Sequence, residues 1–177
     1  MLGVKRYEVR LEEHSEQWKV LFGETETEIR QILGANVMDV QHIGSTAIKG
    51  IVAKPILDVA VTVQQLTAID FCGMECFGYK SRGEAGVPGR SYFAKYRDEE
   101  ITTHHIHCYE QGNSNLLANL AFRDFLIANP VYGRQYSDLK LYLAEQYAND
   151  RATYTNEKTD FIHMVLQLAG FSAGLQG

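Results

Sequence analysis

A glycine-serine-threonine turn followed by a lone acid on an apolar segment is the part of this sequence best suited to chemistry. The run from His42 to Val63 predicts a strand, a turn at Gly44, Ser45 and Thr46, a loop, and a second strand that carries Asp58. Glycine lets a backbone approach a ligand closely, and hydroxyls and amides at such a turn suit phosphate oxygens. A carboxylate is a hard ligand of the kind that Mg²⁺ prefers. We therefore expect the turn to bind phosphate and Asp58 to bind a divalent metal.

A cluster of histidines follows on a later apolar segment, over residues 101–109. Because side chains alternate along a strand, His105 and His107 share one face, and we expect them to point toward Asp58 and His42 in a common cleft. Two or three imidazoles and one carboxylate form a ligand set for Zn²⁺ or Mn²⁺, and an imidazole can also act as a general base. Alternatively, these histidines hydrogen-bond within a polar core or contact only the ligand's phosphates.

Three basic side chains, Lys54, Arg123 and Lys158, are assigned to an anionic ligand. Arginine binds phosphate through a fork of N–H groups, and lysine binds it as a point charge. Structural alternatives stay open for several of these residues. Arg123 and Asp124 could form an ion pair on a helix surface, Asp58 could pair with Lys54, and the hydroxyls of the turn could only cap the next segment.

Two further groups have structural interpretations. Lys140 and Arg151 are expected to be solvated, although an anionic ligand would need some of the basic residues in this part of the chain. Tyrosines recur at helical spacing in the last third of the chain, where packing is the better account. They are Tyr132, Tyr136, Tyr142, Tyr147 and Tyr154.

The elements that position these residues follow from hydrophobic periodicity and from helix start and stop signals. Helices are expected over residues 15–34, 67–74, 114–128, 130–148 and 151–169, and strands over residues 36–43, 56–63, 75–80, 91–97 and 101–109. Ser15 should cap the first helix and Gly34 should end it. The strand 56–63 is continuously apolar, so we expect it and strand 36–43 to be central. The fold class is therefore α/β (α+β), with three helices at the C-terminal end.

Composition limits the classes of partner. The chain has 177 residues, 45% of them hydrophobic and 22% charged, which describes a single domain over residues 1–177. Its formal charge of -5 argues against general binding to nucleic acid or to anionic membranes. Three cysteines show no metal-site spacing and no disulfide pattern. Without a signal-type segment or a run that could span a bilayer, a cytoplasmic protein is expected, with its oligomeric state open.

Several distinctive strings extend the pattern beyond the turn. HIGSTA and AKPILDV are followed by THHIHCYEQGN, LAFRDFLIANP and YSDLKLYLAEQYANDRATYTNEKTDFI. In order and spacing this series resembles the GrpB family over nearly the entire chain. The resemblance implies a nucleotidyltransferase-like fold, a small mixed sheet flanked by helices. It also implies relatives that include an extension fused to some dephospho-coenzyme A kinases. Enzymes of that superfamily hold two metal ions with two acids two residues apart and a third on a neighbouring strand, whereas Ala60 occupies the second position here.

Three functions are consistent with these features. The first is binding of a nucleotide or phosphorylated metabolite, with metal-dependent nucleotidyl transfer in which Asp58 holds Mg²⁺, Arg123 or Lys158 neutralises charge, and His105 or His107 is a base or an auxiliary ligand. The second is a catalytically inactive sensor or partner-binding module, which the missing acid at Ala60 favours. The third is a metal-dependent phosphoester hydrolase that uses the histidines. Whether the protein is an enzyme, and on which substrate and acceptor, is open.

Overall fold

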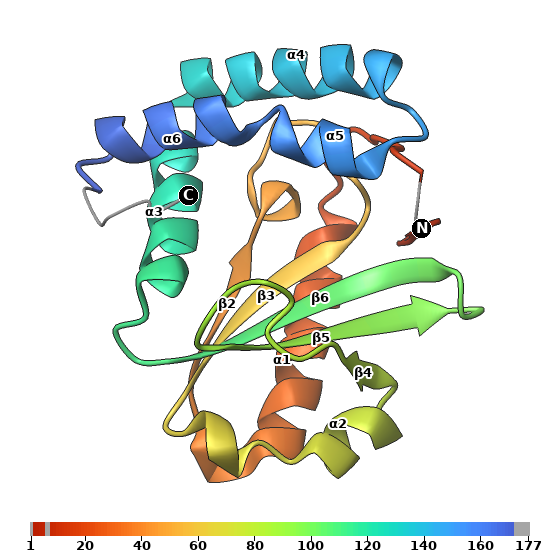
Figure 1. Ribbon diagram of the computed structural model, residues 1–177, viewed down its shortest axis with the longest axis vertical. Helices are drawn as coiled ribbons and strands as arrows, with labels where there is room; N and C mark the ends of the chain where they lie inside the picture. The colour runs from red at the N-terminus through yellow and green to blue at the C-terminus, as the bar shows by residue number, and fades with distance from the viewer. Residues whose placement is uncertain (1, 6–7, 172–177) are drawn as a thin grey trace.

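The computed structural model describes residues 2–5 and 8–171 and shows a mixed sheet flanked by helices (Figure 1). The strands are β1 (Val4–Lys5), β2 (Val37–Ile43), β3 (Leu57–Val63), β4 (Tyr79–Ser81), β5 (Arg90–Arg97) and β6 (Ile101–Glu110). The α-helices are α1 (Gln17–Leu33), α2 (Phe71–Cys76), α3 (Ser114–Ala128), α4 (Pro130–Gln146), α5 (Arg151–Asn156) and α6 (Thr159–Leu168). Short 3-10 turns lie at Gly34–Asn36, Ser45–Ala47 and Leu66–Ala68. None of these helices is long and apolar enough to cross a membrane.

The six strands form one sheet in the order β2-β3-β6-β5-β4, and β1 pairs with the start of β6. Only the β3 and β6 pair runs parallel among the described strands; the other pairs are antiparallel. The strand expected over 56–63 is interior, as its apolar run predicted, because β2 and β6 occupy its two sides. The expectation that β2 is also central was wrong, since β2 pairs only with β3 among the described strands and forms an edge of the sheet.

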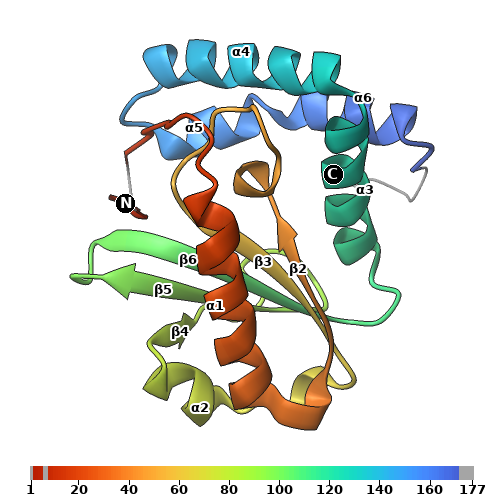
Figure 2. The same ribbon diagram turned by 180° about the vertical axis from the view of Figure 1, so that it is seen from behind.

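The two faces of the sheet are covered by different helices. Helices α1 and α2 cover one face, which Figure 2 shows from the side of α1, and the main apolar core lies beneath them. Ile29 of α1, Val59 of β3 and Ile106 of β6 are fully buried there. Helix α3 packs against the opposite face through Leu116, which contacts Ile43 and neighbouring residues of the sheet. The side chains that alternate along β3 and β6 are therefore divided between an apolar core and a second face that carries polar groups.

Helices α4, α5 and α6 form a layer beyond one end of β3, at the top of Figure 1. This helical layer packs against α3 and the segment after the 45–47 turn. Its core contains Ile48, Ile51, Leu126, Tyr136 and Val165, with Phe161 stacked on Tyr136 at a ring centroid distance of 5.1 Å. The C-terminal helical segment expected from the sequence is confirmed, and it lies close to the loop between β2 and β3.

Most element boundaries agree with the sequence to within two residues. Gly34 ends α1 with a φ of 52°, as expected. The expectation that Ser15 caps α1 was wrong, since Glu16 is the N-cap residue without a side-chain cap bond, although Ser15 Oγ accepts the Gln17 N–H at 3.3 Å. The hairpin of β5 and β6 and the helices α3 and α4 are confirmed, although α4 ends at Gln146. Because the caps and prolines that delimit these elements act locally, they can be recognised in the sequence.

Three elements differ from expectation. The helix expected over 67–74 is α2, which starts at Phe71 because the Asp70 carboxylate accepts the Gly73 N–H at 2.8 Å and caps it. As α2 continues to Cys76, the following strand is displaced to Tyr79–Ser81. The helix expected over 151–169 is two helices, interrupted at Glu157 and Lys158. No proline or glycine marks that interruption, so local sequence signals could not predict it.

Candidate functional site

The parallel pairing of β3 and β6 brings the predicted acid and histidines together. Asp58 is the register partner of His105, and Ala60 is the partner of His107. The donor atoms of Asp58, His105 and His107 all lie within 4.8 Å of one another. The expectation that the two imidazoles share the Asp58 face is confirmed, and the positions between them, such as Ile106, face the apolar core.

Asp58 is the acceptor at the centre of this cluster. His105 Nδ1 lies 2.8 Å from Asp58 Oδ1, and His107 Nε2 lies 3.7 Å from the same oxygen. Burial by itself raises the pKa of Asp58, but the hydrogen bonds and the charges of His105 and His107 outweigh it and hold the pKa well below its usual value. An ionised carboxylate can only accept, so His105 carries a proton on Nδ1, and in the neutral imidazole Nε2 is then the lone-pair nitrogen. Asp58 and His105 thus form an oriented acid-imidazole pair.

Arg90 sets the protonation of the second imidazole. Its Nη1 lies 3.2 Å from His107 Nδ1, and because a guanidinium only donates, Nδ1 accepts. A neutral His107 then carries its proton on Nε2, the atom that faces Asp58. Burial lowers the pKa of His107, which favours this neutral form. A metal ligand usually donates its second ring N–H to an acceptor, so this arrangement does not suit coordination by His107. Asp58, His105 and His107 lie close together, but the positions of the imidazole protons fit a hydrogen-bonded cluster better than a metal site with three ligands.

The turn before β3 has a backbone that requires glycine. Gly44 has φ 68° and ψ -175°, a region that is accessible almost only to glycine. A Cβ built on Gly44 would lie 2.6 Å from Asp58 Oδ2. The turn therefore lies directly against the carboxylate, as the sequence predicted, and places Ser45 and Thr46 beside Asp58.

A buried lysine on α4 holds this turn. Lys140 is 2% exposed, and its Nζ donates to Ser45 Oγ at 2.9 Å and to the Val52 carbonyl. The ammonium also lies 4.5 Å from the Tyr136 ring centroid. Burial lowers the pKa of Lys140 to about 7, and the nearby charges of Lys158 and Lys54 contribute in the same direction. The expectation that Lys140 is solvated was wrong, because the helical layer covers it.

Two more lysines lie around the ring of Tyr154, which is buried on α5. Lys158 Nζ is 4.6 Å from the Tyr154 ring centroid, and Lys54 Nζ is 5.3 Å from it. Burial lowers the pKa of Lys54 to about 7 and that of Lys158 to about 8, and nearby Arg151 contributes in the same direction. Among the contacts of the described residues, Lys54 forms no hydrogen bond or ion pair with Asp58, although that pairing was one alternative for the acid.

These groups line one cavity of about 170 Å³ between the sheet and the helical layer, which we call the lysine cavity. It contains seven of the residues expected from the sequence: Gly44, Ser45, Thr46, Lys54, Asp58, His105 and Lys158. It also contains Tyr136, Lys140 and Tyr154, which the sequence patterns assigned to packing or solvent. The tyrosines are indeed packed, and each forms part of the cavity wall as well. The only sequence signal for Lys140 was its place in the family-like string from Tyr136.

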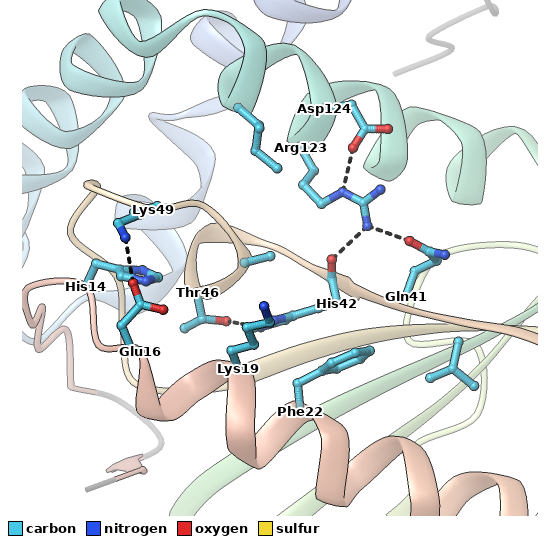
Figure 3. Close-up of a pocket in the computed structure, with 13 residues that line it drawn as sticks. His14, Glu16, Lys19, Phe22, Gln41, His42, Thr46, Lys49, Arg123 and Asp124 are labelled. Carbon is cyan, nitrogen blue, oxygen red and sulfur yellow. Dashed lines mark hydrogen bonds and ion pairs between the residues drawn. The ribbon is translucent and has the colours of Figure 1, made fainter.

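Of the other three predicted residues, His107 belongs to the cluster with Asp58 but does not line the lysine cavity, and the remaining two lie elsewhere. His42 pairs with Val59, on the face opposite Asp58, so the expectation of a common cleft with Asp58 was wrong. Its ring stacks on Phe22 at a centroid distance of 4.9 Å, and its Nε2 is 2.9 Å from Thr46 Oγ1. Burial lowers its pKa to about 4. His42 faces a separate cavity of about 650 Å³ between α1, β2 and α3, which Figure 3 shows.

Arg123 belongs to that separate cavity too. Its Nε donates to Asp124 at 2.7 Å, and its Nη1 donates to Gln41 Oε1 at 2.8 Å and to the His42 carbonyl at 2.9 Å (Figure 3). Arg123 thus connects α3 to β2 and does not line the lysine cavity. The ion pair with Asp124, which the sequence offered as the alternative, is present.

The position of the missing acid is closed to solvent. Ala60 points to the Asp58 face, as strand periodicity predicted, but it is 1% exposed. It packs in an apolar cluster with Ile43, Tyr109 and Leu116 of α3. A carboxylate there would be buried among apolar side chains, so the structure provides no second acid next to Asp58 on β3.

Fold and cavity together define a mixed α/β protein with a six-stranded sheet, in which a glycine turn, an acid-imidazole pair and three lysines meet at the boundary with a helical layer. The chain belongs to the GrpB family, because the family model described as "GrpB protein" matches residues 8–168.

Individual relatives agree with this assignment. The chain is 42% identical over 171 residues to the glutamate-rich protein GrpB of Alkalihalophilus pseudofirmus, covering 94% of this chain and 98% of that protein. It is 36% identical to YqkA of Bacillus subtilis, covering 84% of this chain but 43% of the longer relative. The crystal structure of GrpB from Enterococcus faecalis matches with a TM-score of 0.84 at 34% identity, covering 90% of this chain and 96% of that one.

Proposed function

We propose that this protein binds a nucleotide or another phosphorylated metabolite in the lysine cavity. The observation that carries the proposal is the convergence of Lys54, Lys140 and Lys158 on a cavity in which, among the described residues, Asp58 is the only carboxylate of the lining. Burial disfavours the charged form of each lysine, so a phosphate that neutralises them would gain binding free energy. Ser45 and the adjoining turn add hydrogen-bonding groups for phosphate oxygens.

Binding is tested by thermal stabilisation with pyrophosphate, adenosine triphosphate and ribose 5-phosphate, each with and without Mg²⁺, Mn²⁺ or Zn²⁺. A ligand at about 100 times its Kd should stabilise the wild type by about 2.7 kcal/mol. Lys158→Ala should lose most of that stabilisation, whereas Lys80→Ala, an exposed lysine of β4, should keep it. If no phosphorylated compound raises the melting temperature, or if Lys158→Ala responds like the wild type, the proposal is wrong.

The comparison with and without metal ions tests whether the ligand binds together with a divalent cation. A single carboxylate such as Asp58, together with phosphate oxygens of the ligand, is a common way to hold Mg²⁺. Asp58→Asn should therefore abolish any dependence of binding on Mg²⁺ while leaving some affinity for phosphate alone. Binding that is indifferent to every metal in the wild type would contradict a role for Asp58 as a metal ligand.

A second candidate function, hydrolysis of a phosphoester, is favoured by the Asp58–His105 pair. The carboxylate orients the ring through Nδ1, so a neutral His105 presents the Nε2 lone pair that a general base requires. The base would take a proton from water as the water oxygen attacks phosphorus, and a neighbouring lysine would protonate the leaving oxygen. His105→Gln should reduce phosphate release to background, whereas His104→Gln, on the opposite face of β6, should not. Equal activity of the two variants would exclude this role for His105.

A further inference from the structure

A third cavity, of about 330 Å³, adjoins the lysine cavity at His105, which lines both. We call it the tyrosine cavity, because Tyr92 and Tyr96 of β5 form its floor together with Thr102 of β6. The pairing of β5 with β6 shifts register between Lys95 and Tyr96. Such a β-bulge re-aims side chains, and here it pairs Tyr96 with Thr102 beside His105.

Two arginines complete the wall of the tyrosine cavity. Arg82 lies 5.3 Å from the ring centroid of Tyr96, and its Nη2 donates to the Tyr96 hydroxyl at 2.8 Å. Arg151 of α5 lines the same cavity, and its charge lowers the pKa of Lys54 and Lys158 in the lysine cavity. No carboxylate of the described residues lines the tyrosine cavity. Two cavities that share a residue therefore present three lysines and two arginines in a chain whose formal charge is -5.

The glycine-rich segment 82–90 is fixed over this floor. The main chain of Arg82 and Gly83 exchanges hydrogen bonds of 2.8 Å with Tyr92. Arg90 donates to the carbonyls of Glu84 and Ala85, and its guanidinium lies 4.8 Å from the Tyr92 ring centroid. The segment is therefore held in place as one wall of the cavity, with Ala85 among the residues that line it. A wall held in this way costs little ordering entropy when a ligand binds.

The tyrosine cavity is lined by planar groups, the rings of Tyr92 and Tyr96 and the guanidinium groups of two arginines. Tyrosine rings and guanidinium planes stack on planar aromatic groups, and such stacking contributes about 1–3 kcal/mol per nucleic-acid base. A ligand with phosphates in the lysine cavity would pass His105 and place its other end against Tyr92, Tyr96 and Arg82. We infer that the ligand is a nucleoside polyphosphate, whose base stacks in the tyrosine cavity while its phosphates occupy the lysine cavity. This inference rests on the proposed function.

The test compares adenosine triphosphate with inorganic tripolyphosphate by isothermal titration calorimetry in the same magnesium buffer. Wild type should bind the nucleotide at least about tenfold more tightly, because only the nucleotide has a base to stack. Tyr96→Ala should remove that difference and leave the Kd of tripolyphosphate unchanged. Tyr96→Phe, which keeps the ring and loses only the hydroxyl bonded to Arg82, should retain most of the difference.

The outcomes separate this inference from the proposed function. Equal affinity of wild type for the two compounds, or a Tyr96→Ala variant that weakens both alike, would overturn the nucleotide inference and leave phosphate binding intact. Tighter binding of tripolyphosphate would show that the arginines receive phosphate and not a base. If neither compound binds, the proposed function fails and the inference fails with it. Circular dichroism of each variant confirms that the fold is unchanged.

Discussion

At the scale of single residues, the geometry of the site depends on Gly44. Its φ is positive, and a Cβ at this position would lie 2.6 Å from Asp58 Oδ2, which leaves no room for a side chain. Gly50 also has a positive φ, 81°, but a Cβ there meets nothing within 4 Å. Gly50 is therefore a control position that shares the positive φ but lacks the close approach to Asp58.

We expect Gly44→Ala to be less stable than Gly50→Ala by about 1–3 kcal/mol, because alanine at 44 adds a clash to the strain. Gly44→Ala should also lose binding of the phosphorylated ligand, since it displaces Asp58 or the turn. Chemical denaturation of both variants measures the stability difference. If the two variants lose the same free energy of unfolding, the close approach of residue 44 to Asp58 does not affect stability.

The three lysines predict how binding depends on pH. In the free protein their pKa values are lowered to about 7 for Lys54 and Lys140 and to about 8 for Lys158. A bound phosphate favours the charged form and raises these pKa values, so binding takes up protons between the free and the bound pKa. Affinity should therefore be highest below about pH 7 and fall as the pH rises through about 7 and 8.

Calorimetry in buffers of different ionisation enthalpy at about pH 8 should detect this proton uptake directly. Lys158→Ala should reduce it, and Lys80→Ala should leave it unchanged. An affinity that stays constant from about pH 6 to about pH 9, without proton uptake, would contradict binding by the lysines.

At the scale of elements, the interruption between α5 and α6 is decisive for the cavity. It places Lys158 at the start of α6 and above Tyr154 of α5. Asp150 anchors α5, since its carboxylate accepts the Thr153 N–H at 3.0 Å and the Thr153 hydroxyl at 2.6 Å. Asn113 caps α3 in the same way, through the N–H groups of the first turn, but no described residue of α3 lines the lysine cavity.

Asp150→Ala and Asn113→Ala should each lower stability by about 1 kcal/mol, which corresponds to a fall in melting temperature of about 2–4 °C. Only Asp150→Ala should also lower the affinity for the phosphorylated ligand, because α5 carries Tyr154 and Arg151. Titration at a temperature where both variants are folded distinguishes the two effects. A loss of affinity in Asn113→Ala as large as in Asp150→Ala would show that the cap acts through general stability.

At the scale of the whole molecule, the lysine cavity joins two layers. The sheet and its connections supply Gly44, Lys54, Asp58 and His105, and the helical layer supplies Lys140 and Lys158. A ligand that contacts both layers should suppress local opening of both. Amides of the apolar core that exchange only through global opening should slow as well, because the ligand raises the stability of the whole folded state.

Hydrogen exchange should therefore show ligand-induced protection at residues 44–47 and at residues 151–158 together, when pyrophosphate is added. Helix α2, which lies at the opposite end of the molecule from α4, α5 and α6 in Figure 1, serves as the internal control, and its amides that exchange by local opening should not change. Protection confined to one of the two segments would contradict a ligand that bridges the layers.

Particular residues show how far the sequence could predict the site. The turn at Gly44 and the acid at Asp58 lie in one short string, so local chemistry identified both. His105 followed from strand periodicity, which is equally local. His42 failed because its face depends on which residue of β3 it pairs with, and the antiparallel register gives it Val59. Arg123 failed because its partners, Gln41 and His42, are more than 80 residues away in the chain.

The sequence alone therefore determined most of the elements, the α/β class and the turn with its acid, since propensity, capping and periodicity act over a few residues. Its distinctive strings determined the family. The tertiary structure decided which basic residues meet that turn. In the sequence, Lys140 and Lys158 look like ordinary helical lysines. The packing of α4 over Ser45 brings Lys140 to the turn, and the interruption between α5 and α6 brings Lys158 to Tyr154. The energy that selects these positions comes from packing between distant segments, and single-sequence patterns contain no measure of it.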